Sequence, residues 1–294
     1  MRAARGEKEP WSGRLLPLGL LALLCLVALV AAALLLLPSE DRQEAEIQVQ
    51  APALLSQTPG LSYREEKGVL HDLHYRPAGP SPPVEMTARQ VIFRRLDQEH
   101  WPPRFGQLSV QGLTVAFLGP DTPRWARRLT GDADFSFRLQ PEAENLKITD
   151  ARFRLDGLGD LALNLSLDKV ASTAPLSSLG QAALSTMTLD FTDAGFFAVL
   201  LGDLAASEGL PESQLRHQLY ALSQFLSAET ASPVLREVLS AVRVIAERES
   251  DGVMLAVSAT PATPYPLQRL RELRGYPLPN LSALNDLNLR VDTH

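Results

Sequence analysis

The stretch LALNLSLDKV, residues 161–170, alternates apolar and polar side chains with the period of a β-strand. One face of the extended chain carries Leu161, Leu163, Leu165 and Leu167. The other face carries the small or polar side chains between them. Because burying each large aliphatic side chain contributes about 1.5–3 kcal/mol, the leucine face has to be covered. The cover is either the chain's own helices or a molecule from outside.

Strand patterns continue on both sides of this stretch. Residues 61–192 contain a series of alternating segments separated by Gly, Pro and Asp turns, which predicts an antiparallel β meander. Two of the segments change phase in the middle, one across Gln111-Gly112 and one after Ile148. A phase change of this kind predicts a β-bulge or a kink in a long curved strand.

The apolar period becomes helical at residue 193 and stays so to residue 249, which predicts a three-helix insertion. The residues expected to begin the three helices are Thr192 or Asp193, Pro211, and Ser232-Pro233. The second helix is expected to bury a stripe formed by Leu215, Leu219, Leu222, Phe225 and Leu226. Residues 250–294 then return as strands of the same domain.

The predicted fold class is α+β: a large curved antiparallel sheet with the three-helix insertion packed on one face, preceded by a single transmembrane helix. Three helices of about 12–17 residues cover only a limited width of a sheet of about nine strands. Part of the apolar face is therefore expected to stay open as a groove. The four leucines of residues 161–167 are the candidate lipid-facing residues.

Near the N-terminus, residues 15–37 form an uncharged run of mostly Leu, Ala and Val. A helix over this run would rise about 1.5 Å per residue and reach about 34 Å, enough to cross a bilayer. We predict a cytoplasmic N-terminus (1–14), a transmembrane anchor (15–37) and a stalk (38–60). The alternative is a cleavable signal peptide, with a small-residue site at 31–33. A lipoprotein is excluded because the residue before Cys25 is Leu24.

The charges predict the orientation and exclude one class of partner. Residues 1–14 hold four basic and two acidic residues, and removing them from totals of 28 and 34 leaves a net charge of −8 on the remainder. Basic residues stay on the cytoplasmic side, so residues 38–294 are predicted to face the other compartment. An acidic domain of this kind argues against nucleic acid as a partner and gives no support to docking on anionic lipid. Arg far outnumbers Lys, which is typical of GC-rich bacteria and favours a bacterial inner membrane and the periplasm.

Few residues offer chemistry. His71 and His74 lie at i and i+3, but an extended strand would point them to opposite faces, and Cys25 is the only cysteine of the chain. Surface histidines are the better interpretation. His100, beside Trp101, is expected in a loop.

Two other groups are interpreted in structural terms. Asp193 is expected to cap a helix, and Asp190 to lie on the polar face of a strand, rather than to form a catalytic carboxylate pair. Residues 125–128, WARR, are expected to form a solvated turn, with contact to a phosphate headgroup as the alternative. The sequence contains neither a phosphate-binding loop nor a nucleophile motif, and no cofactor or metal is predicted.

The order of these phrases resembles a known group of proteins. LSVQGLTVAFLGPDTP (108–123), ITDARFRLDGLGDLALNLSLDKV (148–170), MTLDFTDAGFFAVLLGDLAASEGL (187–210) and DGVMLAVSATPATPYPLQRL (251–270) are similar to YdgA-type proteins of unknown function and, more loosely, to AsmA-like bacterial envelope proteins. The resemblance implies a membrane-anchored, periplasm-facing β-rich domain and, for AsmA-like proteins, a role in envelope lipid handling or outer-membrane assembly. This chain is short for such a role, and no functional residue is carried over.

These observations predict a non-enzymatic, membrane-anchored periplasmic protein that supports envelope maintenance, by binding lipid acyl chains or an envelope protein partner on an uncovered part of its sheet. The alternative is a structural accessory subunit of an envelope or secretion complex, with a closed core and no ligand.

Overall fold

The computed structural model describes residues 60–66, 68–76, 84–97, 99–100, 103–117, 126–171, 181–247, 252–272 and 285–294. The predicted cytoplasmic N-terminus (1–14), the predicted anchor (15–37) and all of the predicted stalk except Gly60 lie outside these residues.

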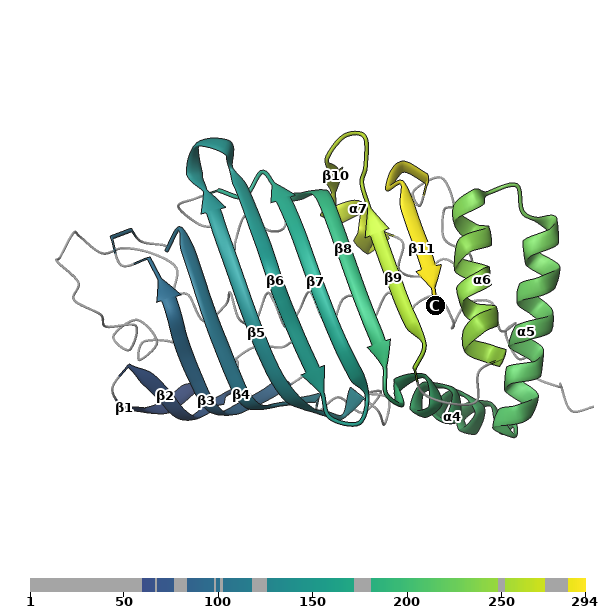
Figure 1. Cartoon of the computed structure of the whole chain (residues 1–294), viewed down its shortest axis with the longest axis horizontal. Coiled ribbons are helices and arrows are strands. Elements are labelled where there is room, and N and C mark those ends of the chain that lie inside the picture. The colour runs from purple at the N-terminus through teal and green to yellow at the C-terminus, as the bar shows by residue number, and fades with distance from the viewer. Residues whose placement is uncertain are drawn as a thin grey trace, which may run out of the picture.

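One antiparallel sheet of 11 strands organises the described chain (Figure 1). The strands are β1 Leu61–Glu66, β2 Val69–Tyr75, β3 Val84–Leu96, β4 Phe105–Phe117, β5 Arg128–Gln140, β6 Asn145–Leu155, β7 Gly159–Asp168, β8 Ala183–Asp193, β9 Met254–Ala259, β10 Tyr265–Pro266 and β11 Leu289–Thr293. Strands β1 to β9 lie side by side in chain order, β11 pairs with β9, and β10 pairs with one end of β8. The meander follows from short turns, such as the 3₁₀ turn Pro141–Ala143 between β5 and β6.

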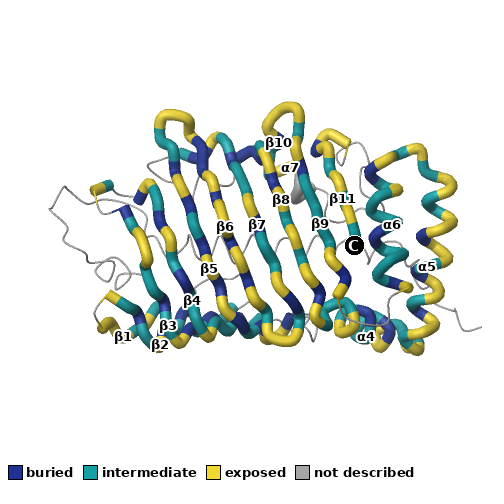
Figure 2. The backbone as a smooth tube through the Cα atoms, viewed as in Figure 1, coloured by how far each residue is buried: buried dark blue, intermediate teal, exposed yellow. Residues whose placement is uncertain are grey.

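The sheet has an apolar and a polar face. We call the face that carries Leu163 the inner face and the opposite one the outer face. The main core lies on the inner face of β5–β8 and includes Phe135, Phe137, Leu146, Ile148, Phe153, Leu163, Leu167, Leu184 and Met187. A second core cluster joins β2, β3 and β4, and the half-buried Val110 and Leu113 of β4 pack against both clusters. The inner face is therefore apolar from β2 to β9, as Figure 2 shows by the alternation of buried and exposed positions along the strands.

Both predicted bulges are confirmed. The register of β4 against β5 shifts between Val110 and Leu113, and that of β6 against β7 shifts between Ile148 and Ala151. The extra residue lets the apolar alternation resume on the inner face after the shift, because a slip of one residue would otherwise turn every later side chain to the outer face.

The two bulges are built alike. Each contains a residue in the left-handed region, Gly112 with φ 60° and Asp150 with φ 57°. The neighbouring strand supplies the acceptor for its N–H: Gly112 donates to Asp132 Oδ1 (2.8 Å), and Asp150 donates to Asn164 Oδ1 (3.0 Å). Gly and Asp are among the residues that tolerate this backbone conformation.

Three long helices follow β8: α4 Phe196–Glu208, α5 Glu212–Glu229 and α6 Pro233–Glu247, with a short α7 at Leu267–Glu272. Asp193, the last residue of β8, accepts hydrogen bonds at Oδ1 from the N–H groups of Gly195 and Phe197 (3.2 Å each). The N-cap residue of α4 is Gly195, two positions after the predicted Asp193. Ser232 Oγ accepts the N–H of Leu235 (3.3 Å), which confirms Ser232-Pro233 as the start of the third.

The predicted fold class is wrong in where it places these helices. They do not pack together on one face of the sheet: α6 lies beside the edge strand β11, and α5 packs against α6 on the side away from the sheet (Figure 1). Only the start of α4 contacts a face, at the end of β8, where Phe196 and Phe197 meet Phe191. Glu237 of α6 accepts the N–H of Val291 on β11 (3.0 Å). An apolar stripe predicts that one side of a helix is buried, but it does not predict which element buries it. Here α6 lies against the edge strand β11, whose backbone N–H groups would otherwise be unpaired.

The predicted fold class also put a transmembrane helix before the sheet. In the part of the chain that the structure describes, no helix is long and apolar enough to cross a membrane. The helix predicted over residues 15–37 lies outside the described residues.

Candidate functional site: the inner apolar surface

The four candidate lipid-facing leucines of β7 divide into two pairs. Leu163 and Leu167 are buried, with 2% and 4% of their surface exposed. Leu161 and Leu165 are half-buried. All four lie on the inner face and contact the same core cluster, so only the second pair offers accessible apolar area.

Cross-strand pairing extends this accessible area from β7 to β11. Leu163 pairs with Leu189 of β8, Leu189 with Val257 of β9, and Val257 with Val291 of β11. The half-buried Leu and Val side chains on the inner face of these four strands form what we call the inner apolar surface: Leu161, Leu165, Leu189, Leu255, Val257, Leu289 and Val291. Phe191 of β8 lies on the same face, where it contacts Phe196 and Phe197 of α4. Sequence reasoning named only the leucines of β7, although each of the other residues could be found by its place in an alternating strand.

The three long helices reach only the margins of this face: Phe196 and Phe197 of α4 contact Phe191 of β8, with ring centroids 5.6 and 5.8 Å apart, and α6 lies along β11. The core cluster on this face includes Leu267 of α7 but no residue of α4, α5 or α6 among the described residues. Near one end, α4 approaches the sheet: its Phe196 and Leu200 pack against Ala126 and Leu129. A surface of aliphatic side chains without charges can hold an apolar chain by exclusion of water and has no group suited to bond-making chemistry.

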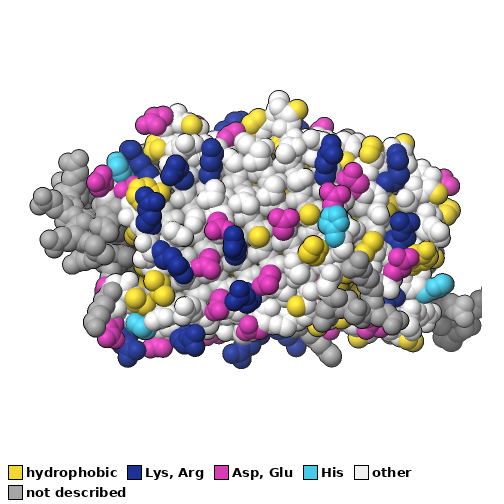
Figure 3. Space-filling view, in the orientation of Figure 1, with side chains coloured by type: hydrophobic (Ala, Val, Ile, Leu, Met, Phe, Trp, Pro, Cys, Tyr) yellow, Lys and Arg dark blue, Asp and Glu magenta, His cyan; other side chains and the backbone are white. Residues whose placement is uncertain are grey.

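The outer face, by contrast, is polar, and Figure 3 shows acidic and basic side chains interspersed over the strands in view. A shallow hollow of about 430 Å³ lies on it. The ion pairs at the hollow are Arg152–Asp150 (2.7 Å), Arg154–Asp160 (3.5 Å) and Arg94–Asp134 (3.9 Å). All six side chains are more than half exposed, and such pairs contribute about 0–1 kcal/mol each. The outer face is a solvated surface rather than a binding site.

One polar group on the outer face was missed by sequence reasoning. Arg94 Nε donates to Ser109 Oγ (2.9 Å), and the Ser109 hydroxyl donates to Asp134. These residues come from β3, β4 and β5, and only their strand register brings them together. Ser109 is 4% exposed and forms no hydrogen bond with a histidine of the described chain, so the group lacks the base and the access that a nucleophile needs.

The prediction that His71 and His74 point to opposite faces of the sheet is wrong. Asp72 has φ 52°, and the register of β1 against β2 shifts there, so Leu70 and Leu73 both enter the core. The two histidines consequently share the outer face. His74 Nε2 lies 2.6 Å from Glu85 Oε1, and no three His, Cys, Asp or Glu side chains of the described residues form a group that could hold a metal ion.

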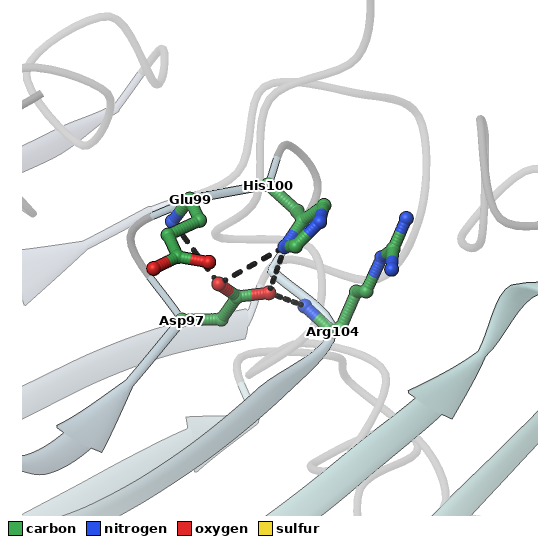
Figure 4. Close-up of polar contacts among 4 residues, drawn as sticks. All are labelled: Asp97, Glu99, His100 and Arg104. Carbon is green, nitrogen blue, oxygen red and sulfur yellow. Dashed lines mark hydrogen bonds and ion pairs between the residues drawn. The ribbon is translucent and has the colours of Figure 1, made fainter. Parts of the chain in front are cut away.

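The carboxyl group of Asp97 organises the loop between β3 and β4 (Figure 4). Oδ1 accepts the N–H of Glu99 (3.1 Å), and Oδ2 accepts the N–H of Arg104 (2.9 Å) and lies 3.0 Å from His100 Nδ1. Burial raises the pKa of Asp97, but the hydrogen bonds from Arg104, Glu99 and His100 outweigh it and leave the pKa below its ordinary value of 3.8. All partners of this carboxylate belong to the loop itself, which indicates a structural role.

The remaining sequence candidates also have structural places. Asp193 is buried and accepts hydrogen bonds from the turn that leads into α4, whereas Asp190 is exposed on the outer face of β8. Trp125 lies outside the described residues, Ala126 is buried, and Arg127 and Arg128 are exposed at the start of β5.

The model of one protein family, described as "Uncharacterized protein", matches residues 143–293, just over half of the 294-residue chain. The chain belongs to this family. The matched segment contains β6 to β11 and the helices, and therefore the whole inner apolar surface. Neither the curated proteins nor the solved structures contain a match to the chain.

Proposed function

We propose that this protein binds the acyl chain of a lipid on the inner apolar surface and catalyses no reaction. The observation that carries the proposal is the run of half-buried aliphatic side chains across β7, β8, β9 and β11, which α4 and α6 approach only at its margins. It matches the chemistry of a hydrocarbon chain, since it is extended, uncharged and without hydrogen-bonding side chains.

The expected energies are adequate for retention. Burying a methylene group contributes about 0.8 kcal/mol, so roughly ten methylenes laid on this surface contribute about 8 kcal/mol before the costs of ordering. Because association itself costs several kcal/mol, retention depends on how much of the acyl chain the surface buries.

The source of the lipid is a further part of the proposal. A location at a bacterial inner membrane, with residues 38–294 in the periplasm, and a role in envelope maintenance would place the inner apolar surface beside such lipids. The resemblance to YdgA-type and AsmA-like proteins supports this location and role.

The second candidate function is an accessory subunit with a closed core and no ligand. It is favoured by the nearly complete burial of Leu163 and Leu167 at the centre of the inner face. The two candidate functions make different predictions for the half-buried side chains. In the lipid-binding protein Val257 and Leu189 contact an acyl chain, whereas in the accessory subunit they contact no ligand.

Mass analysis of lipid bound to the purified full chain tests the proposal. We expect phospholipid or fatty acid to co-purify with the wild-type chain and to be reduced several-fold in Val257→Thr, which keeps the branched side chain of a strand residue but adds a hydroxyl to the surface. The control is Ser258→Thr on the outer face of the same strand, which should retain the lipid. Lipid-free wild-type protein, or equal loss in both variants, would overturn the proposal.

A further inference from the structure

A hollow of about 470 Å³ lies at the end of the sheet where β9 is followed by β10 and α7 (Figure 1). Its volume is within the range of about 300–1,000 Å³ that small-molecule sites occupy. We call it the β9–α7 hollow. Its polar lining comes from the loop after β9, from α7 and from the residues before β11, and includes Thr260, Arg269, Asn285, Asp286 and Asn288.

The β9–α7 hollow borders the inner apolar surface. Asn288 directly precedes Leu289, which is a residue of that surface. Tyr265 belongs both to the lining of the hollow and to the core cluster on the inner face. Leu267 of α7, two residues before Arg269, packs against the same cluster. A molecule whose apolar part lies on the inner apolar surface is therefore placed to put its polar end into the hollow.

Hydrogen bonds hold the walls of the hollow in place. Asn288 Nδ2 donates to the carbonyl oxygen of Thr260 (3.3 Å) and to its Oγ1 (2.9 Å), and the N–H of Thr260 donates to the carbonyl oxygen of Leu287 (3.1 Å). The N–H of Leu267 donates to the carbonyl oxygen of Ala182 (2.9 Å), which ties the start of α7 to the sheet. Walls that are fixed before a ligand arrives lower the cost of ordering on binding.

The β9–α7 hollow carries one cation and one anion that do not neutralise each other. Arg269 and Asp286 are both exposed. Within the part of the chain that the structure describes, neither side chain forms an ion pair or a hydrogen bond. The hollow on the outer face differs, because its arginines are paired with aspartates. A hollow with a separate positive and negative side chain is complementary to a ligand that itself carries both charges.

We propose that the β9–α7 hollow binds the zwitterionic headgroup of a phospholipid, with Arg269 at the phosphate and Asp286 at the ammonium group. A guanidinium donates paired hydrogen bonds to phosphate oxygens, and a carboxylate accepts hydrogen bonds from a primary ammonium group. The inference rests on the proposed acyl-chain binding and names the class of lipid, a phospholipid with a primary amine such as phosphatidylethanolamine. Phosphatidylglycerol supplies the phosphate but leaves Asp286 without an opposite charge.

Lipid exchange on the purified full chain tests the headgroup. The chain is incubated with mixed micelles that hold phosphatidylethanolamine and phosphatidylglycerol in equal amounts and with the same acyl chains, and the bound lipid is identified by mass analysis. We expect the wild-type chain to retain about three-fold more phosphatidylethanolamine, as one exposed ion pair allows. Asp286→Asn should remove this preference, because only the partner of the ammonium group is lost. Arg269→Gln should lower the retention of both lipids.

The outer face of β11 supplies matched controls. Arg290→Gln and Asp292→Asn make the same two charge changes at exposed positions of that face. Both should keep the preference and the amount of lipid of the wild-type chain. Because each control has the net charge of its test variant, a change confined to Arg269→Gln and Asp286→Asn reports the hollow and not the charge of the protein.

The amount of lipid and the choice of headgroup are separate results. Equal retention of the two lipids by the wild-type chain, or a preference that survives in Asp286→Asn, would overturn the inference and leave acyl-chain binding standing. A wild-type chain that retains neither lipid would overturn the proposed function and the inference with it.

Soluble glycerophosphoethanolamine tests the other source of the same chemistry, since it has the headgroup without the acyl chains. We expect it to leave bound phosphatidylethanolamine in place at equal concentration, because it gains nothing from the inner apolar surface. Displacement of the lipid at that concentration would show that the hollow takes the free zwitterion, and would overturn the lipid as its ligand.

Discussion

The Glu237 carboxylate of α6 accepts the backbone N–H of Val291 on the edge strand β11, with Oε2 3.0 Å from the nitrogen. This contact joins residues 54 positions apart and replaces the hydrogen bond that a further strand would make. It holds α6 at the edge of the sheet, so the pair of α5 and α6 continues the sheet sideways instead of lying over it.

Removal of this acceptor is expected to destabilise the domain. Glu237→Ala leaves the N–H of Val291 without its partner at a part-buried site, which costs about 1–3 kcal/mol, and it opens an edge to pairing with other chains. Glu237→Gln keeps an acceptor oxygen and should recover most of the loss. Urea denaturation and light scattering measure both effects, with Glu247→Ala at the exposed end of the same helix as the control. An unchanged unfolding free energy in Glu237→Ala would show that the contact is dispensable.

The Asp97 loop gives the fold a dependence on acid. Because the folded-state pKa of Asp97 lies below its ordinary value of 3.8, the carboxylate stabilises the fold above that pH, and the contribution disappears as the pH falls through the folded-state pKa. The difference in unfolding free energy between wild type and Asp97→Asn should therefore be largest near neutral pH and shrink below about pH 4. Asp156→Asn, in an exposed turn, should show no such trend. If the difference in unfolding free energy between wild type and Asp97→Asn does not change with pH, the charge of Asp97 does not contribute to stability.

The two kinds of leucine on β7 should respond differently to truncation. Leu163 is 2% exposed, so Leu163→Ala should cost about 2–5 kcal/mol, and Leu163→Asp should prevent folding. Leu165 is half-buried, and Leu165→Ala should cost clearly less while lowering lipid retention. Urea denaturation measures the first effect and mass analysis of bound lipid the second. Equal destabilisation by the two alanine variants would place Leu165 in a closed core.

The sequence predicted those features that depend on neighbouring residues. The strands, the two bulges at Gly112 and Asp150, and the cap at Ser232 follow from side-chain alternation and from the backbone preferences of single residues. The bulge at Asp72 escaped notice because an Asp in a strand resembles any exposed polar residue, and it reversed the expected placement of His71 and His74.

Features that depend on distant pairing could not be predicted. The stripe of α5 is apolar along its length, but the helical core cluster ends at Tyr220, and Phe225 remains 63% exposed. Nothing local distinguishes an apolar position that is buried within the chain from one that awaits a partner. For the same reason, the position of α6 at the edge of the sheet, fixed by Glu237 and Val291, required the structure.

The most direct test of acyl-chain binding is a photo-crosslink from the sheet itself. A benzophenone amino acid is placed at Val257 on the inner apolar surface or at Ser258, the next residue on the outer face, and the full chain is irradiated in its native membrane before purification. If the inner apolar surface binds an acyl chain, the protein gains the mass of one lipid when the probe is at position 257 and gains none when it is at position 258. The absence of a lipid adduct at position 257, with the chain folded and the probe photoreactive, would contradict acyl-chain binding.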